Sequence, residues 1–540
     1  MRVFRLKTFV VVSVLALLSL GGCRRKEVAK DSPIELVPAE KLGQTVGMVA
    51  EVPSPAPVPV QGYGIVAGLA GTGSSHCPVP VRKYLDRYVR TELAGLHVNV
   101  EQLIQSRNTA VVQLEGVVPA APSRNERFDV RVSPVEGSDA TSLHGGRLYR
   151  AELYPEGLVG LKGRLAGTVE GVVYVNLIGT GSPDLTTGYA LGGGRAAYEY
   201  RSILQLRRAH FAVANQLRNR INERYGSGTA TAISPTDIEL RIPPQYRWRK
   251  ERFIELLRAT YLEQTSELIQ SRVNTFVHTL AVGEEKAAAE IALEAIGRAS
   301  LPKLGALLHS SDEEVSFRAA RCMLSLEDDR GLAALRNVVM DKDSPYRREA
   351  LDAVAVLARR RDAALLVQRL LRDDDVRLVL AAYEHLRRMQ NPAVTQELVG
   401  RSFYLEQVTQ TSHKAVYVSR SGQPRIVIFG GPLICRDNLF VESPGGGVLI
   451  DSPAGQDYVA ITRSRPSGLG VIGPVRTGFA LRDIVRTLGS EPAAAKGTPA
   501  GLGVSYGEIA VLLQQLVAKD AVDAAFWAGP LPKIGLIVKK

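Results

Sequence analysis

The sequence predicts an α+β protein of several domains: a mixed α/β N-terminal part, an inserted α-solenoid, and a β-rich C-terminal part that closes with a helix. Three observations lead to this prediction. At 540 residues the chain is too long for a single hydrophobic core. Strand-like and helix-like segments mix up to about Pro243, and strands return beyond Phe403. Between these parts, from about Gly283 to Arg401, the pattern is almost wholly helical and dominated by Ala, Leu, Arg and Glu.

The first residues have the pattern of an exported, lipid-anchored protein. A positive region precedes the apolar stretch Phe9 to Leu20; its length of about a dozen residues is too short for a bilayer span but suits a signal peptide. The stretch ends in Leu-Gly-Gly-Cys at Cys23, which resembles a bacterial lipobox. We therefore expect Cys23 to be acylated and to become the mature N-terminus. The alternative is an ordinary secretory signal that happens to contain a cysteine.

The net charge of +12 and the pI near 9.5 predict an affinity for an anionic partner. Candidates are nucleic acid, lipid headgroups and an acidic cell-wall polymer, and export excludes nucleic acid as the default. We therefore interpret the basic and aromatic segment Tyr246 to Lys250 as a solvated surface patch, although single-strand binders use the same mixture. Arg24, rather than an Asp, follows Cys23; by resemblance to enterobacterial lipoproteins this favours the outer membrane.

The remaining cysteines predict neither a disulfide framework nor a metal site. Cys77, Cys322 and Cys435 are widely separated and form no CxxC pair. At most one bridge can form among them, and the sequence does not choose which. His76 beside Cys77 could ligate a metal only with distant partners, so we expect a structural loop there.

Local patterns predict the elements of the N-terminal part. Prolines at every second position from Pro53 to Pro59 favour an extended spacer or an edge segment. Two segments read as strands, 109–118 and 126–135, because apolar and polar residues alternate in the second. Residues 210–226 predict an amphipathic helix with Phe211, Ala214, Leu217 and Ile221 on one face and Gly226 as its cap.

The helical region contains a repeat. Similar segments start at Asp312, Asp343 and Asp373, with spacings of 343 − 312 = 31 and 373 − 343 = 30 residues. Each begins with an Asp-rich turn suited to N-capping, and a period near 30 with two short helices per unit predicts a stacked solenoid that resembles HEAT-like repeats. The alternative is an irregular helical bundle. Near the end of the chain, Ser505 and Glu508 match a capping box that opens the last helix.

The glycine-rich segment Gln61 to Pro78 tests whether the chain is an enzyme. Its nearest match to a phosphate loop, Gly68 to Ser75, has Ser74 where the lysine must stand. The chain contains neither G-x-S-x-G nor H-E-x-x-H, and no carboxylate pair stands out for glycoside cleavage. We conclude that these glycines permit positive φ angles and close backbone approach. No enzymatic activity, catalytic residue, cofactor or metal is expected.

Four blocks of the sequence resemble the bacterial flagellar P-ring proteins, in the family's order. They cover about half of the chain, and they are Gly62 to Ser75 ("GYGIVAGLAGTGSS"), Asn108 to Tyr154, His210 to Pro243, and Gly503 to Gly529 ("GVSYGEIAVLLQQLVAKDAVDAAFWAG"). The chain departs from the family in Ser74 and Ser75, which replace Gly-Asp, in the Pro-rich spacer, in the lipobox and in the helical repeats.

The resemblance implies a structural subunit of the flagellar basal body. Many copies would form a ring around the rod in the periplasm and abut the L-ring, with peptidoglycan as an expected contact and Cys23 as the outer-membrane anchor. The alternative is an envelope lipoprotein scaffold that binds a protein partner through its HEAT-like repeats and has no role in motility. The copy number, the subunit interfaces and the partner of the repeats do not follow from the sequence.

The expected domains are a lipoprotein signal peptide at 1–23, a tether with the Pro-rich spacer at 24–60, an α+β P-ring-like domain at 61–282, HEAT-like repeats at 283–401, and a β-rich C-terminal segment with a terminal helix at 402–540.

Overall fold

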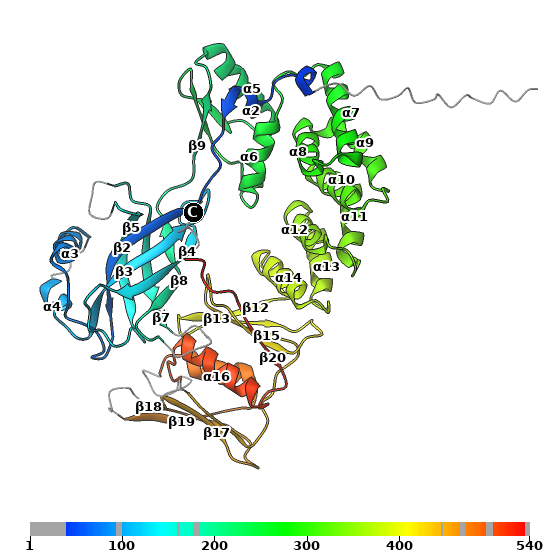
Figure 1. Cartoon of the computed structure of the whole chain (residues 1–540). Helices are drawn as coiled ribbons and strands as arrows, with labels where there is room; N and C mark the ends of the chain where they lie inside the picture. The colour runs from blue at the N-terminus through cyan, green and yellow to red at the C-terminus, as the bar shows by residue number, and fades with distance from the viewer. Residues whose placement is uncertain are drawn as a thin grey trace, which may run out of the picture.

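The computed structural model places four units around a central opening (Figure 1). It describes residues 39–92, 100–158, 163–175, 184–443, 446–464, 470–492 and 501–534. Cys23, and with it the predicted signal peptide and lipid site, lies outside the described residues. We call the four units the barrel, the small sheet unit, the helical stack and the C-terminal unit. Within the described residues, none of the helices combines the length and the apolar character needed to cross a membrane.

The barrel is a closed sheet of six strands. Its order is β4-β3-β2-β5-β6-β8, with β4 paired back to β8 and a short β7 added on β8. The alternating apolar residues of these strands fill the interior, as Val112, Leu114, Val130 and Val132 illustrate, and this confirms the predicted strand pattern. The strands are β2 (Val58–Ala67), β3 (Thr109–Val118), β4 (Arg127–Pro134), β5 (Arg147–Pro155), β6 (Gly167–Val172), β7 (Tyr174–Val175) and β8 (Gly188–Ala196).

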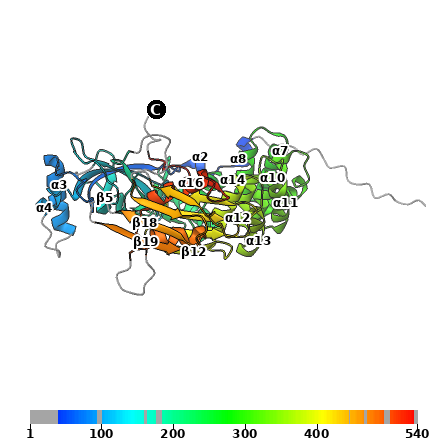
Figure 2. The ribbon, with the colours of Figure 1, turned by 90° about the horizontal axis from the view of Figure 1, so that it is seen from below.

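Two helices, α3 (Val79–Glu92) and α4 (Val100–Ile104), cover the outside of the barrel, at the end of the molecule away from the helical stack (Figures 1 and 2). Leu85 and Ile104 are buried in a separate small core against this face. The helix after the glycine-rich segment is therefore present, and it packs on the barrel wall.

The small sheet unit packs two helices on a four-stranded antiparallel sheet of order β1-β9-β11-β10. Helix α5 confirms the predicted amphipathic helix, since Ala214, Leu217 and Ile221 are buried and Gly226 caps it with a φ of 110°. Phe211 is an exception: it lies in the first turn, is 68% exposed and does not join the core. The elements are η1 (Ala39–Leu42), α2 (Val46–Val49), β1 (Ala50–Glu51), β9 (Ser202–Leu206), α5 (Phe211–Tyr225), β10 (Ala230–Ala232), β11 (Asp237–Leu240), η2 (Pro244–Tyr246) and α6 (Lys250–Ala259).

The prediction of an unpacked tether and spacer up to residue 60 does not agree with the structure for residues 46–60. Val46, Ala50 and Val52 are buried in the core of the small sheet unit, because the two-residue strand β1 pairs with β9. The last residues of the Pro-rich run also belong to a strand and not to a spacer. Val58 and Pro59 begin β2, which pairs with β3 on one side and β5 on the other. Packed structure therefore begins well before residue 61.

The helical stack consists of α7 to α14, and each helix from α10 onward packs against the next. Helices α8, α10, α12 and α14 also contact one another in turn and form the row nearer the opening, whereas α9, α11 and α13 lie at the outer edge (Figure 1). The helices are α7 (Ser266–Val282), α8 (Lys286–Ile296), α9 (Leu301–Leu307) after the short η3 (Arg298–Ser300), α10 (Glu313–Ser325), α11 (Asp329–Met340), α12 (Arg347–Leu357), α13 (Arg360–Leu370) and α14 (Val376–Arg388).

The Asp-rich turns of the stack agree only in part with the predicted caps. Asp312 caps α10 by accepting hydrogen bonds from the backbone N–H groups of the first turn. Helix α12 begins at Arg347, four residues beyond Asp343, which therefore does not cap it. Asp375 caps α14. Asp373, which the repeat pattern placed at this helix start, instead pairs with Arg347.

The C-terminal unit holds two helices between two sheets. One sheet has the order β12-β13-β15-β14-β20 and the other β16-β17-β18-β19. This unit starts at Thr395, seven residues before the expected boundary at 402, because β12 pairs with β13. The elements are β12 (Thr395–Val399), β13 (Phe403–Val408), β14 (Ala415–Val418), β15 (Arg425–Phe429), β16 (Leu439–Glu442), β17 (Val448–Ser452), β18 (Val459–Ser464), β19 (Val471–Thr477), α15 (Leu481–Gly489), α16 (Tyr506–Ala518) and β20 (Ala525–Ala528).

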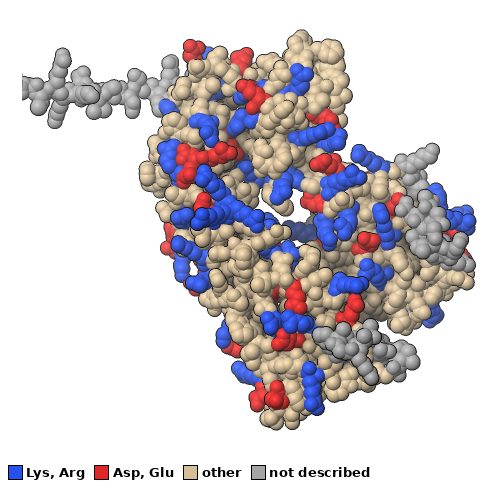
Figure 3. All heavy atoms as spheres, turned by 180° about the vertical axis from the view of Figure 1, so that it is seen from behind, with Lys and Arg blue, Asp and Glu red and all other residues tan. Residues whose placement is uncertain are grey.

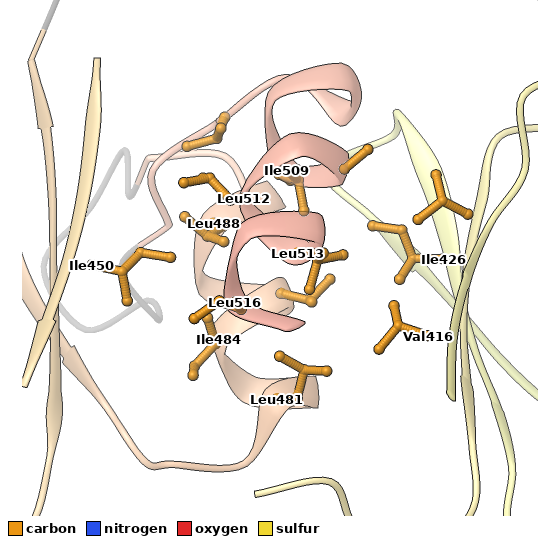
Figure 4. Close-up of a cluster of buried hydrophobic side chains, with 14 of the residues drawn as sticks. Val416, Ile426, Ile450, Leu481, Ile484, Leu488, Ile509, Leu512, Leu513 and Leu516 are labelled. Carbon is orange, nitrogen blue, oxygen red and sulfur yellow. The ribbon is translucent and has the colours of Figure 1, made fainter. Parts of the chain in front are cut away.

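Helix α16 forms the centre of this unit. Its Leu512, Leu513 and Leu516 are fully buried and lie between Val416 and Ile426 of one sheet and the side chains of α15 and the other sheet (Figure 4). The predicted capping residue is confirmed, since the Ser505 hydroxyl accepts a hydrogen bond from the Glu508 N–H at 3.4 Å.

Replacing Leu513 by Ala should lower the free energy of unfolding by about 2–5 kcal/mol, because it leaves a cavity between the two sheets. Thermal and urea unfolding of the purified variant would measure this change. Leu531→Ala is the matched control, because the Leu531 side chain is half exposed. Equal unfolding midpoints for the two variants would contradict the packing described for α16.

Candidate functional site

The glycine-rich segment is a barrel strand followed by a tight loop. Gly68 and Gly71 have φ angles of 85° and 90°, which disfavour any other residue. A Cβ on Gly73 would lie 2.0 Å from the Thr109 carbonyl oxygen, and the Ser74 hydroxyl is bound to the Asp139 carboxylate. The prediction that these glycines serve the backbone is therefore confirmed, because the segment packs against β3 instead of opening a ligand loop.

The three described cysteines are separate, buried, free thiols. Burial raises the pKa of the Cys435 thiol to about 12, and burial also raises the pKa of Cys77. His76 has its imidazole against Gly137. Within the described residues no group of three or more His, Cys, Asp or Glu side chains is arranged to hold a metal ion.

Lys and Arg side chains gather around the central opening (Figure 3). One cavity of about 630 Å³ and another of about 740 Å³ lie where the barrel meets the small sheet unit, and both include Arg247 and Lys250 in their walls. The other basic side chains that line them are Arg124, Arg201, Arg241, Arg249 and Arg252.

The segment Tyr246 to Lys250 contributes directly to this region. Trp248 is 62% exposed, and the Arg247 guanidinium lies 5.0 Å from the centre of its ring. Tyr246 is buried, and Lys250 binds Glu126 at 3.0 Å. The interpretation of the segment as a solvated surface patch is therefore right for Arg247 and Trp248. It is wrong for Tyr246, which is buried in the core of the small sheet unit, and for Lys250, which joins that unit to Glu126 of the barrel.

A buried ionic cluster joins the small sheet unit to the helical stack. Glu290 on α8 is fully buried and contacts three guanidinium groups: Arg252 of α6 at 3.2 Å, and Arg318 and Arg321 of α10 at 3.1 and 2.6 Å. Glu294, one turn later, binds Arg252 at 2.6 Å. A carboxylate without water requires such partners, so the cluster sets the angle between α6, α8 and α10.

A second buried carboxylate joins the other end of the stack to the C-terminal unit. Glu406 of β13 is fully buried and accepts hydrogen bonds from Arg387 at 2.8 Å and from the Tyr383 hydroxyl at 2.5 Å, both on α14. Arg425 of β15 binds Glu384 at 2.8 Å. Both ends of the helical stack are thus fixed to the rest of the chain by charged hydrogen bonds.

The barrel and the C-terminal unit meet at Asp129. Its carboxylate accepts the backbone N–H groups of Gly192 at 2.7 Å and Gly422 at 2.9 Å. Burial raises the pKa of Asp129, and the hydrogen bonds from Gly422 and Gly192 oppose that shift. Tyr174 of the barrel donates a hydrogen bond to the Ser402 carbonyl oxygen at 2.8 Å. These contacts complete the circle of four units.

The sequence analysis did not identify Glu290, Glu406 or Asp129. Glu290 and Glu294 lie at i and i+4 on an alanine-rich helix, a spacing typical of a solvated face. The interpretation of the Asp373–Asp375 turn as a capping segment is correct for Asp375, while Asp374 pairs with Lys342.

We expect Glu290→Gln to lower the free energy of unfolding by roughly 3–5 kcal/mol, because three partly buried guanidinium groups would lose their shared, fully buried carboxylate. The unfolding midpoint and the rate of proteolysis between α6 and α8 would measure the loss. Glu285→Gln is the control, since Glu285 is exposed on the same helix and its side chain makes no capping bond. A Glu290→Gln protein as stable as this control would show that the cluster does not hold the two units together.

Comparison with known proteins gives a match for the N-terminal part of the chain. Residues 47–289 match the family described as flagellar P-ring protein. The flagellar P-ring protein of Nitrobacter hamburgensis is 29% identical over 202 residues, which cover 34% of this chain and 51% of the relative. That of Idiomarina loihiensis is 27% identical over 241 residues, covering 41% and 62%. That of Shewanella woodyi is 26% identical over 272 residues, covering 47% and 71%.

The chain spans about half to two thirds of the length of the first two of these relatives. The match includes the barrel, the small sheet unit and α7, and it ends within α8. The relatives are named as components of a flagellar ring and not as enzymes, and at the level of this family the prediction of a non-enzymatic chain is confirmed. Over residues 47–289 the chain is therefore similar to the flagellar P-ring proteins, as its sequence motifs indicated.

Proposed function

We propose that the chain is a structural subunit of the P ring of the flagellar basal body. The observation that carries this proposal is the match of residues 47–289, which include the entire barrel and the small sheet unit. Many copies would assemble head to tail around the rod in the periplasm, through an interface that closes by rotation. The ring would act as a bushing in which the rod turns, with the L-ring as its neighbour.

The proposed domain layout adds a helical insertion to this ring subunit. Residues 283–401 would be a short HEAT-like solenoid between the P-ring-like domain, 61–282, and the C-terminal segment, 402–540, except that the packed residues 46–60 join the first domain and β12, from Thr395, joins the last segment. The contacts within the row of α8, α10, α12 and α14 support a solenoid, because each of these helices contacts the next one in the row, as the helices of stacked repeats do. Two ends fixed by buried Glu–Arg contacts suit a rigid part of a mechanical ring better than a mobile arm.

The envelope partners are part of the same proposal. Residues 1–23 would be a lipoprotein signal peptide, and acylated Cys23 would attach the subunit to the outer membrane through the segment 24–38. The net charge of +12 would favour contact with the anionic peptidoglycan layer.

Deletion of the gene should abolish swimming, and basal bodies purified from the deletion strain should lack the P ring. Soft-agar motility assays and electron microscopy of purified basal bodies would measure both effects, and the wild-type gene supplied in trans should restore them. Normal swimming and intact rings in the deletion strain would refute the proposal. That result would favour an envelope scaffold without a role in motility.

Cys23→Ser should release the protein from the membrane fraction, because serine has no thiol to acylate. The acyl chains would supply the apolar surface that holds the mature protein at the bilayer. Fractionation of the periplasm and membranes, followed by immunoblotting, would detect the shift. Cys77→Ser is the control, since Cys77 is a buried thiol outside the lipobox. Unchanged membrane association of the Cys23→Ser protein would contradict lipidation at this residue.

A further inference from the structure

The outer edge of the helical stack carries an exposed surface of basic and apolar side chains. It is made by exposed residues on and just after α11 and α13, two helices at the outer edge of the stack, and we call it the outer stripe. It consists of Arg336 and Met340 on α11, Arg361, Leu365 and Arg369 on α13, and Arg372 just beyond α13. Met340 is 47% exposed and Leu365 58% exposed.

The charges of the outer stripe are not balanced within the molecule. Among the described residues no salt bridge involves Arg336, Arg361, Arg369 or Arg372. The exposed residues within α11 and α13 include a single carboxylate, Asp329, and further exposed carboxylates, such as Asp341 and Asp374, lie in the turns that follow these helices. Elsewhere on the stack some exposed cations are paired, as Arg298 is with Glu327 and Lys342 with Asp374, whereas no salt bridge of the described residues involves the exposed Arg359, Arg377 or Arg388. Unpaired arginines around exposed apolar side chains are typical of surfaces that meet anionic lipid headgroups.

The start of the described chain lies on the same helical stack. The segment Ala39–Leu42 packs on α7, where the fully buried Arg272 donates a hydrogen bond to the Leu42 carbonyl oxygen at 2.7 Å (Figure 1). Cys23 precedes Ala39 by 39 − 23 = 16 residues. At roughly 3.5 Å per extended residue, these can reach at most about 55 Å. A lipid attached at Cys23 would therefore hold Ala39, at the junction of the small sheet unit and the stack, within about 55 Å of the bilayer.

We propose that the outer stripe is a membrane-contacting surface that binds the anionic phospholipid headgroups of the bilayer. The arginines bind the phosphates, and Leu365 and Met340 reach into the headgroup region. The contact orients the subunit so that the outer edge of the stack faces the membrane and the central opening faces away from it. This inference deepens the proposed attachment to the outer membrane, but the binding itself requires neither the acyl chains nor assembly of a ring.

Vesicle binding of the chain from residue 24 onward tests the proposal, because this protein retains every described residue and lacks Cys23. It should co-sediment with vesicles of phosphatidylethanolamine and phosphatidylglycerol, and not with vesicles of phosphatidylcholine alone. Higher salt should weaken the binding, since the arginines are exposed. The triple variant Arg336→Glu, Arg361→Glu, Arg369→Glu should lose at least about tenfold in partition coefficient. Leu365→Ser should lower the partition coefficient as well, but by less than the triple variant does.

The control is a triple variant of equal charge change, Arg150→Glu, Arg207→Glu, Arg208→Glu, whose side chains are exposed on the barrel and the small sheet unit. It should bind vesicles like the parent protein, and equal unfolding midpoints would show that all variants fold. The proposal is overturned if the parent does not bind anionic vesicles, or if the control loses as much as the stripe variant. It is also overturned if the stripe variant loses binding to purified cell-wall sacculi while vesicle binding is unchanged.

Discussion

The arrangement of the four units depends on one buried carboxylate, Glu290. An ionised side chain removed from water is costly unless charged partners replace the lost hydration. Glu290 obtains these partners from two different units, because Arg252 belongs to α6 of the small sheet unit and Arg318 and Arg321 belong to α10 of the stack. Apolar surfaces can slide with little loss, but a carboxylate between three guanidinium groups tolerates one geometry. The angle at which the stack leaves the small sheet unit is therefore set by hydrogen-bond directions.

The other end of the stack is also fixed by a buried carboxylate, which belongs to a strand of the C-terminal unit. Glu406 is equally buried, and its partners Arg387 and Tyr383 come from the last helix of the stack. Between these two fixed ends the stack has an apolar core. The barrel and the C-terminal unit are joined in turn by the Asp129 carboxylate, which accepts hydrogen bonds from the backbone of Gly192 in the barrel and of Gly422 in the C-terminal unit. A closed circle of four units cannot bend at one interface without changing the others. The molecule is suited to carry load with little deformation.

Sequence patterns correctly predicted the features that depend on neighbouring residues alone. The 3.6-residue periodicity of α5, the cap at Gly226, the two barrel strands and the backbone role of the glycines all agree with the structure. The failures involve partners remote in sequence. A spacer was predicted for the residues that form β1 and the start of β2, because the strands that pair with them lie far along the chain. Glu290 resembles a solvated residue until α6 and α10 are placed against it, since burial is a property of the tertiary structure.

The position of β20 has a consequence for how the molecule is made. Strand β14 is buried along its whole length and pairs with β15 on one side and with β20, near the end of the chain, on the other. Until β20 has been synthesised, β14 presents an open, apolar edge that can pair with strands of other chains. A polypeptide that stops before β20 would thus leave this edge exposed to aggregation and to proteolysis.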